Sequence, residues 1–519
     1  MSQANALPRE FNAADYFLNN HQARLNKAAF IDDNGTTTYA ELIAGVNKAA
    51  NVLRGYGLQP ETRVAMVMLD SVSFPFVFLG AIKAGLVPVP INTLLTSENY
   101  EYIIRDCRAP LVISSKALSP VLQPALDKQP HLRHQISVDE ADRVACEFTS
   151  LLDAASPDAE TADTRADDVA FWLYSSGSTG NPKGVKHLHR NIVYTAETFG
   201  RLVLGISERD TVFSAAKLFF AYGLGNGLTF PLSVGATTVL RRERPIPQLV
   251  FDVFANHKPT LYFGVPTLYA AILGDEGLAG ARKADELRLC VSAGEALPAD
   301  IGERWEKHFG VPIVDGVGST EMLHIFLSNR PTDVRYGSSG TAVPGYEVKL
   351  VDESGDEVSA GDIGELVVNG DSSAEGYWNQ RDKSKATFAG QWTYTGDKYY
   401  RNEEGYYYIC GRTDDMFKSG GNWVSPFDIE ACLISHTAVL EAGVVPREDD
   451  HGNTKPMAFV VLTSGIQGGD ALAAELQTHV KSKLEKWKYP RWIEFRTELP
   501  KTATGKIQRY KLRNEQSAS

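Results

Sequence analysis

One stretch of small and polar residues decides the fold: Tyr174-Ser175-Ser176-Gly177-Ser178-Thr179-Gly180-Asn181-Pro182-Lys183-Gly184-Val185, which follows the apolar run Ala170-Phe171-Trp172-Leu173. An apolar run followed by glycines and hydroxyl residues predicts a strand that runs into a loop. Glycine lets the backbone approach a ligand closely and adopt positive φ, and successive N–H groups form a concavity that binds anions. With the charge of Lys183 added, the loop is predicted to surround a polyphosphate.

Two other interpretations of this loop are less favoured. A flexible surface linker rarely carries Pro-Lys-Gly beside a buried strand. A Walker A loop ends in Gly-Lys followed by Ser or Thr, whereas Pro182 precedes Lys183 and Gly184 follows it here. The pattern therefore favours a nucleotide site of a class other than the P-loop NTPases.

Length, net charge and cysteine content limit the number of domains, the kinds of partner and the cellular compartment that are expected. A chain of 519 residues is too long for one core, so two or more folding units are expected. The formal net charge of −12 disfavours nucleic acid or an anionic membrane as the main partner. Five scattered cysteines without zinc-type spacing, no basic and apolar leader and no run of about 18 apolar residues predict a reduced, cytoplasmic protein without a membrane span.

The first part of the chain alternates between helical and strand patterns. Helices are predicted over 42–53 and 74–84 and strands over 63–69 and 87–91, which is the β–α–β rhythm of a parallel sheet. Residues 117–166 are poorer in pattern and are predicted to be a surface excursion. After the glycine-rich loop the rhythm resumes, with strands predicted at 211–213, 236–240, 259–263 and 287–292.

The sequence pattern changes from about residue 335. Short β-like runs separated by Gly, Asp and Pro predict a small antiparallel barrel up to residue 410. The last 105 or so residues carry strand and helix signals of their own, enough for a small domain. The expected fold is α/β, with a large N-terminal domain (1–411) of mixed and parallel sheets plus the small β-barrel, and a small α+β C-terminal domain (412–519).

Four further motifs suggest chemistry. Gly318-Ser319-Thr320-Glu321 is predicted at a strand end, where Glu321 is favoured as a Mg²⁺ ligand over a helix N-terminal acid. The segment 292–296 either packs against an adenine or is a tight turn, and the two stay open. Asp397 is suited to ribose hydroxyls, although spacing alone favours a turn aspartate. Lys506 lies in a small flexible segment and, taken alone, is a solvated surface lysine.

Together these motifs resemble a known family. Their order, 174–185, 318–321, 394–397, 411–415 and 500–506, is similar to that of the adenylate-forming enzymes, which include acyl- and aryl-CoA ligases, luciferases and peptide synthetase adenylation domains. The resemblance spans about residue 30 to Arg513. The segments 214–225 and 315–329 resemble the benzoate–CoA ligase branch.

The resemblance implies a reaction in two steps. A carboxylate attacks the α-phosphorus of ATP to give an acyl-adenylate and pyrophosphate, and coenzyme A then displaces AMP. It implies ATP, Mg²⁺ and coenzyme A, a small aromatic acid, most readily benzoate, and a C-terminal domain that rotates between steps. A 2-aminobenzoate or hydroxybenzoate ligase, an aryl adenylation enzyme that loads a carrier protein, and an inactive nucleotide sensor are the alternatives. Whether a second copy of the chain is a partner stays open.

The resemblance also assigns residues. Lys506, Glu321 and Thr179 would be catalytic, and Glu321 and Thr179 would hold Mg²⁺, with Thr320 nearby. Asp414 would be the hinge and Gly421 would face the coenzyme A channel. The acid pocket would comprise Phe220, Ala221, Tyr222, Gly318, His324 and Ile325, with His324 a lining residue and not a base. ATP or AMP would contact Ser175, Ser176, Gly177, Ser178, Thr179, Gly180, Lys183, Ala293, Gly294, Glu295, Asp315, Gly316, Ser319, Thr320, Asp397, Arg412 and Lys506.

Two positions depart from the wider family. Val317 stands where many members have an aromatic residue, so adenine stacking there is expected to be weaker or replaced. The stretch 418–422 carries an extra glycine where serine is common.

Overall fold

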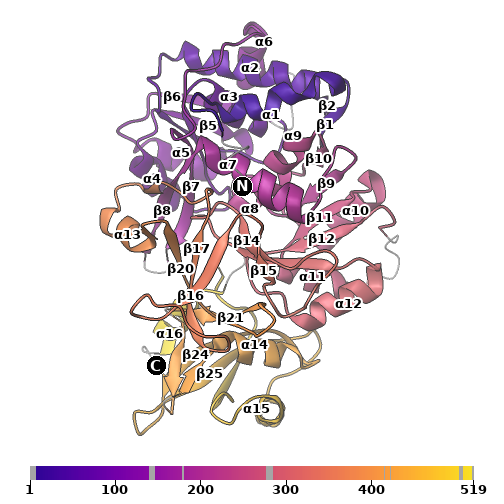
Figure 1. Ribbon diagram of the computed structural model, residues 1–519, viewed down its shortest axis with the longest axis vertical. Coiled ribbons are helices and arrows are strands. Elements are labelled where there is room, and N and C mark those ends of the chain that lie inside the picture. The colour runs from indigo at the N-terminus through magenta and orange to yellow at the C-terminus, as the bar shows by residue number, and fades with distance from the viewer. Residues whose placement is uncertain are drawn as a thin grey trace.

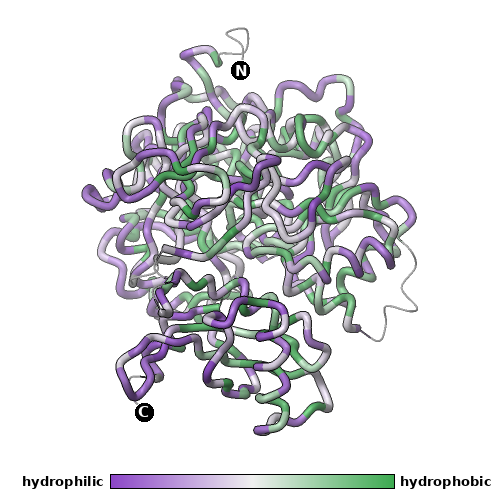
Figure 2. The backbone as a smooth tube through the Cα atoms, turned by 60° about the horizontal axis from the view of Figure 1, so that its bottom comes forward, coloured by the Kyte–Doolittle hydropathy of each residue, from purple (hydrophilic) through white to green (hydrophobic). Residues whose placement is uncertain are grey.

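The structure is a computed structural model that describes residues 7–139, 146–177, 180–275, 284–413, 415–420, 422–501 and 507–516. Elements up to about residue 340 form the larger, upper part of the molecule in Figure 1, and those that follow residue 412 form the smaller, lower part. Hydrophobic segments run mainly through the interior, and hydrophilic segments are frequent on the outer turns (Figure 2). The α/β fold with a large N-terminal and a small C-terminal part is confirmed.

The largest sheet has nine strands in the order β15-β14-β13-β12-β11-β9-β10-β1-β2. Six strands, from β1 to β13 in that order, are parallel, and β2, β14 and β15 are antiparallel to their neighbours. The strands are β1 (Ala28–Asp32), β2 (Gly35–Thr38), β9 (Thr211–Ser214), β10 (Thr237–Val239), β11 (Leu261–Gly264), β12 (Leu289–Ser292), β13 (Ile313–Gly318), β14 (Ile325–Ser328) and β15 (Thr341–Ala342).

The direction of the parallel strands positions the site. β11 and β12 are buried along their whole length, as expected of central strands covered on both faces. Since the parallel strands run the same way, their carboxyl ends share one edge, where Ser292 lies beside Asp315. Ligands of open α/β sheets bind at such an edge. The segments after β12 and β13 therefore lie together, as the predicted strand ends require.

A second sheet is fully parallel, in the order β4-β3-β5-β6. It comprises β3 (Arg63–Val67), β4 (Val87–Pro90), β5 (Leu111–Ser115) and β6 (His134–Val138). The prediction that 117–166 is only a surface excursion is wrong, because this segment supplies the edge strand β6 and the helices α5 (Ser119–Leu126) and α6 (Glu147–Ala154). An edge strand is short and half exposed, and α5 contains Pro124, so neither has a strong sequence pattern.

The glycine-rich stretch forms a β-hairpin and not a strand followed by a long loop. β7 (Val169–Gly177) pairs with β8 (Gly180–Leu188), and β8 pairs with β18 (Gly376–Tyr377). Ser175 faces Lys183, and the pairing continues to Gly177 and Gly180. The predicted loop was too long because backbone hydrogen bonds of a ladder do not require apolar side chains, so serine and glycine continue it.

Helices cover both large sheets. One core cluster joins α2 and α3 to strands of both sheets, and another packs α10, α11 and α12 on the other face of the nine-stranded sheet around Tyr262 and Trp305. The helices not yet bounded are α1 (Ala13–Leu18), η2 (Asn19–Arg24), α2 (Tyr39–Gly55), α3 (Ser73–Lys83), α4 (Ser97–Cys107), η3 (Lys116–Leu118), α7 (His189–Thr195), η4 (Ala196–Val203), α8 (Ala221–Leu224), η5 (Gly225–Thr229), α9 (Phe230–Val234), α10 (Pro247–His257), α11 (Pro266–Leu273), α12 (Ala299–Phe309) and α13 (Arg381–Thr387).

Two smaller units complete the chain. The predicted antiparallel unit is a half-barrel of β16 (Glu347–Val351), β17 (Ile363–Asn369), β19 (Phe388–Ala389), β20 (Trp392–Arg401) and β21 (Tyr407–Arg412). The α+β unit comprises β22 (Phe417–Ser419), β23 (Asn422–Val424), α14 (Pro426–Ile434), β24 (Val439–Glu448), β25 (Thr454–Leu462), α15 (Asp470–Lys483), β26 (Trp492–Arg496) and α16 (Arg509–Gln516). Of the helices described, none is long and apolar enough to cross a membrane.

Candidate active site

The turn between β13 and β14 is tightly wound. Met322 N–H donates to Ser319 Oγ at 3.2 Å, Leu323 N–H donates to the Thr320 carbonyl at 3.1 Å, and Leu323 has a φ of 64°. A Cβ on Gly318 would lie 2.4 Å from the His324 carbonyl oxygen, so only glycine fits. A non-glycine residue in the left-handed region costs free energy that surrounding contacts must offset, and such strain concentrates at functional sites. The turn holds Glu321 at the carboxyl end of the sheet.

A cation, a carboxylate and a phenol meet where this turn reaches β8 and β18. Lys183 Nζ lies 3.6 Å from Glu321 Oε1 and 4.3 Å from the centre of the Tyr377 ring. The Tyr377 hydroxyl donates to Glu321 Oε1 at 2.8 Å. The sequence predicts Lys183 and Glu321 but not Tyr377, which follows a glycine on a two-residue strand without a recognisable motif.

Burial and charge compete on this pair. Burial has the largest effect on Glu321 and would raise its pKa, but Lys183 and the Tyr377 hydrogen bond outweigh it, so the pKa of the carboxyl is lowered. Burial also lowers the pKa of Lys183, and the nearby charges of Lys383 and Arg412 act in the same direction while Glu321 opposes them. The charged carboxylate is therefore favoured at neutral pH.

Glu321 suits Mg²⁺ that arrives with a nucleotide. Mg²⁺ prefers oxygen ligands and is usually bound by one or two carboxylates together with phosphates and water. No group of three or more His, Cys, Asp or Glu side chains in the described part of the chain could hold a metal alone. A single buried carboxylate beside the hairpin fits that mode of binding.

The hairpin offers further polar groups next to Lys183. Ser175 faces Lys183 across the ladder, and its Oγ is buried with no hydrogen-bond partner in the described ranges. A buried hydroxyl without a partner is costly unless a ligand or water satisfies it. Gly177 faces Gly180 further along the ladder, and Ser176 lies at the irregularity between Ser175 and Gly177. Ser178 and Thr179 lie outside the described residues.

Asp397 and Arg412 face one another across the β20–β21 ladder. Arg412 Nη1 donates to Asp397 Oδ1 at 2.8 Å and to the Thr395 carbonyl at 3.0 Å. The charge of Arg412 also favours the charged form of Glu321, so this pair lies near the Glu321 carboxylate. The structure thus brings together the predicted ribose-binding residues and the predicted metal ligand.

The predicted adenine segment also lies at this edge. Gly294 follows β12 with a φ of 98°, and a Cβ there would meet no atom within 4 Å, so the space beside it is open. Asp315 Oδ2 accepts a hydrogen bond from Leu297 N–H at 3.4 Å. Burial raises the pKa of the Asp315 carboxyl to about 8. Ala293, Glu295, Gly316, Ser319 and Thr320 belong to the same two segments.

The predicted acid pocket gathers around His324. The rings of Tyr222 and His324 lie 5.6 Å apart, and the Tyr222 hydroxyl donates to the Val291 carbonyl at 3.1 Å. Phe220 is the N-cap of α8 and Ala221 its first residue, and Ile325 begins β14 and pairs with Gly318. Burial lowers the pKa of His324 to about 3, so the ring is neutral.

His324 has further neighbours that the sequence does not predict. His324 Nε2 and Asn226 Oδ1 share a hydrogen bond of 3.1 Å, and Phe230 packs edge-on at 4.7 Å. A Cβ on Gly225 would lie 2.5 Å from His324 Cδ2, so a glycine is required there. Asn226 is four residues after Tyr222, which is the spacing of one helix face and is a signal that could have found it.

Asp414, Gly421 and Lys506 lie outside the described residues. Their neighbours are tied together by ion pairs. Arg509 Nη2 lies 2.6 Å from Glu430 Oε2, and Arg513 Nη1 lies 2.7 Å from Asp415 Oδ1. These contacts link the residue after the predicted hinge to α16.

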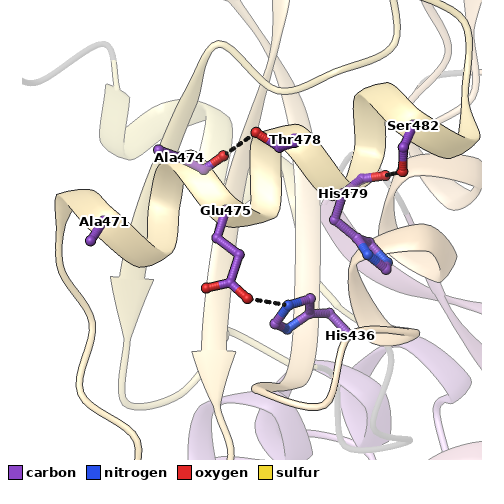
Figure 3. A pocket seen from close by; sticks show the side chains of 7 residues that line it. All are labelled: His436, Ala471, Ala474, Glu475, Thr478, His479 and Ser482. Atoms are coloured by element: carbon purple, nitrogen blue, oxygen red, sulfur yellow. Dashed lines mark hydrogen bonds and ion pairs between the residues drawn. The ribbon is translucent and has the colours of Figure 1, made fainter.

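A separate groove of about 530 Å³ lies on the C-terminal unit, along α15. Figure 3 shows His436 Nε2 3.1 Å from Glu475 Oε1, while the hydroxyls of Thr478 and Ser482 donate to backbone carbonyls of the same helix. It contains none of the predicted site residues.

Comparison with known proteins agrees with this geometry. The chain is 53% identical to the benzoate–CoA ligase of Thauera aromatica over 98% of this chain and 97% of that protein. The crystal structure of a benzoate CoA ligase from Burkholderia xenovorans LB400 aligns with a TM-score of 0.90 and 50% identity, covering 97% of this chain and 100% of that one. The anthranilate CoA ligase AuaEII, solved with anthranoyl-AMP, aligns with a TM-score of 0.94 and 41% identity over 98% of each chain.

Family models match both parts of the chain. The AMP-binding enzyme model matches residues 17–378, and the model of the AMP-binding enzyme C-terminal domain matches residues 428–506. With a match over most of the chain and relatives at more than half identity over nearly its full length, the protein belongs to the family of AMP-binding enzymes.

Proposed function

We propose that the protein is an AMP-forming benzoate–CoA ligase, which converts benzoate, ATP and coenzyme A into benzoyl-CoA, AMP and pyrophosphate. Similarity to ligases of that name over nearly the whole chain supports this proposal. The observation that carries it is the placement, at one sheet edge, of the charged Lys183–Glu321 pair and the uncharged Tyr222–His324 pocket. ATP, coenzyme A and the acid are the small-molecule partners.

The first half-reaction joins two anions. A carboxylate oxygen bonds to the α-phosphorus of ATP while the bond from that phosphorus to the pyrophosphate oxygen breaks. Since an anion approaches a polyanion, positioning and electrostatic stabilisation dominate the catalysis. Lys183 and the hairpin backbone would hold the phosphates, and Glu321 with Thr179 would hold Mg²⁺, which neutralises phosphate charge when bound. Lys506 would bridge the carboxylate and the α-phosphate.

The remaining nucleotide contacts follow from the same placement. Asp397 would accept hydrogen bonds from the ribose hydroxyls, and Arg412, which holds Asp397, would add a donor beside them. The segments after β12 and β13, 293–295 and 315–320, would enclose the adenine. Gly294 leaves open space beside the adenine position, which fits a flat ring.

The second half-reaction uses coenzyme A. The thiol sulfur bonds to the acyl carbon, the thiol proton goes to solvent, and the bond to the AMP oxygen breaks. We place the boundary between domains 1–411 and 412–519, with Asp414 as the hinge and Gly421 on the coenzyme A channel. Rotation about Asp414 would withdraw Lys506 once the adenylate has formed.

The acid pocket suits an uncharged ring. Tyr222, Ile325 and Phe220 supply apolar surface, and the neutral His324 carries no charge that would demand a charged substituent. A 2-aminobenzoate ligase is the second candidate, because the anthranilate ligase AuaEII aligns with a TM-score of 0.94 and Asn226 offers a polar edge to the pocket.

An assay over a panel of acids tests the function. Benzoate, 2-aminobenzoate, 4-hydroxybenzoate and hexanoate are compared by pyrophosphate release and AMP release, with and without coenzyme A. Benzoate should give the highest kcat/KM, and sustained AMP release should require coenzyme A. Hexanoate above benzoate would overturn the aromatic substrate, and 2-aminobenzoate above benzoate would favour the second candidate.

A further inference from the structure

Tyr377 is held rigidly beside the hairpin. Its backbone pairs with Val185 on β8, and its N–H donates to Ser384 Oγ at 3.0 Å. Two residues before β18, the Ala374 N–H donates to the Glu321 carbonyl at 2.8 Å. The side chain is buried, and the Phe388 ring lies 5.3 Å away. The phenol therefore has a fixed position relative to β8 and to Glu321.

The Tyr377 side chain contacts two groups of opposite charge, one with its ring and one with its hydroxyl. The face of the ring lies 4.3 Å from Lys183 Nζ, a geometry in which the ring attracts a cation. The hydroxyl donates to Glu321 Oε1 at 2.8 Å. A phenol is protonated at neutral pH, so this hydroxyl is a donor.

A bound nucleotide would change what Lys183 and Glu321 contact. Without it they lie 3.6 Å apart and compensate each other. Phosphate would draw the ammonium and a divalent cation would draw the carboxylate, so each would lose part of its partner. Tyr377 contacts both groups independently of that pairing and would keep each one in place.

We propose that Tyr377 is a positioning residue for metal–nucleotide binding: its hydroxyl orients the Glu321 carboxylate toward the cation, and its ring holds the Lys183 ammonium toward the phosphates. The proposal rests on the nucleotide site of the proposed function. Outer partners of metal ligands typically contribute about 10- to 100-fold to metal affinity or activity.

Two substitutions separate the two contacts. Tyr377→Phe removes the hydroxyl and keeps the ring, and Tyr377→Leu removes both. Tyr16→Phe is the matched control, because Tyr16 also donates to a carboxylate, Glu197 Oε1 at 2.5 Å, but from α1 to η4. Each variant is titrated with α,β-methylene-ATP without metal, and then with Mn²⁺ in the presence of that nucleotide, using the electron paramagnetic resonance signal of free Mn²⁺.

Tyr377→Phe should weaken Mn²⁺ binding about tenfold and leave metal-free nucleotide affinity within about twofold, because only the Glu321 contact is lost. Tyr377→Leu should weaken both, and Tyr16→Phe neither. Mn²⁺ affinity within twofold of the parent in Tyr377→Phe would overturn the proposal, as would an equal loss in Tyr16→Phe. The assay contains no aryl acid, so a wrong substrate leaves it unaffected, whereas failure of the parent to bind any nucleotide would reject the proposed function itself.

Discussion

The two ends of the candidate site differ in whether their buried ionisable groups are charged: Glu321 is charged at the hairpin end, and His324 and Tyr222 are neutral at the pocket end. At the hairpin end, Lys183 lies 3.6 Å from Glu321, and this contact keeps the buried carboxyl's pKa below its ordinary value. At the pocket end, burial lowers the pKa of His324 to about 3 and raises that of Tyr222 well above its ordinary value. Burial acts at both ends, and the presence of an opposite charge decides the outcome.

This difference matches the substrate proposed. Benzoate has a charged carboxylate and an apolar ring, and its carboxylate must meet a phosphate while the ring is sheltered from charge. The Gly318–His324 turn joins the two environments, since it bears Glu321 at one side and His324 at the other. A change at one end should therefore affect one part of the substrate and spare the other.

Removing the carboxylate charge gives the largest expected effect. Glu321→Gln keeps the size of the side chain but removes the negative charge that would hold the cation. Loss of one such electrostatic contact commonly costs about 10² to 10³ in kcat. Pyrophosphate release with saturating benzoate should fall by that factor, while the KM for benzoate should stay within about twofold.

Glu375→Gln is the control for this change. Glu375 lies on the segment next to β18 and forms an ion pair with Lys186, but its side chain is 47% exposed. Its substitution should leave the rate within about twofold of the parent enzyme. A tenfold loss in both variants would mean that general surface charge, and not the Glu321 position, controls the reaction.

A substitution that crowds the uncharged pocket should have a smaller effect. It should impair use of benzoate and leave ATP binding nearly unchanged. Gly225→Ala places a Cβ 2.5 Å from His324 Cδ2, so the ring must move. Overpacking of this kind costs about 1–3 kcal/mol. The kcat/KM for benzoate should fall about tenfold, while the KM for ATP should hardly change.

Gly227→Ala tests whether that loss is specific. Its Cβ would meet Leu218 Cδ2 at 2.9 Å, which is the end of a flexible side chain and not the His324 ring. Benzoate turnover should be affected less than in Gly225→Ala. Equal losses would show that any added methyl group on η5 disturbs the pocket.

The sequence predicts features that depend on neighbouring residues better than contacts between residues far apart in the chain. Strand ends and the order of short motifs are local, so the sheet edge and residues such as Glu321 and Lys183 could be predicted, with their roles left to experiment. Tyr377 and Asn226 act through partners 56 and 98 residues away in sequence. No motif marks Tyr377, and only the four-residue spacing from Tyr222 marks Asn226. The strand β6 was missed because an edge strand lacks a fully apolar run.

The uncharged state of His324 predicts a dependence of stability on pH. Its pKa is about 3 in the folded protein and about 6.5 in the unfolded chain. Below pH 6.5 His324 binds a proton in the unfolded chain but stays neutral in the folded protein. This contribution to the free energy of unfolding is therefore complete above pH 6.5 and declines as the pH falls toward 3. Between pH 7.5 and 5.5 this one group should cost about 1.4 kcal/mol.

Urea unfolding of the parent and of His324→Gln at these two pH values isolates that contribution. Other histidines titrate in both proteins and cancel in the difference. The parent should lose about 1.4 kcal/mol more than the variant. Equal losses would mean that His324 is protonated in the folded protein and that the pocket end is not free of charge.

The smallest effect is expected from a charge that belongs to neither end. Arg513 Nη1 lies 2.7 Å from Asp415 Oδ1, and the Arg513 side chain is 30% exposed, while Arg509 also contacts Asp415 at 3.5 Å. A partly exposed pair of this kind contributes about 0–1 kcal/mol. Arg513→Gln should therefore lower the free energy of unfolding, measured by urea unfolding, by less than about 1 kcal/mol. The rates of both half-reactions, measured by separate pyrophosphate-release and thioester assays, should change by less than about threefold. A selective loss of thioester formation would show that this ion pair controls the C-terminal unit, so that charge outside the sheet edge also governs the reaction.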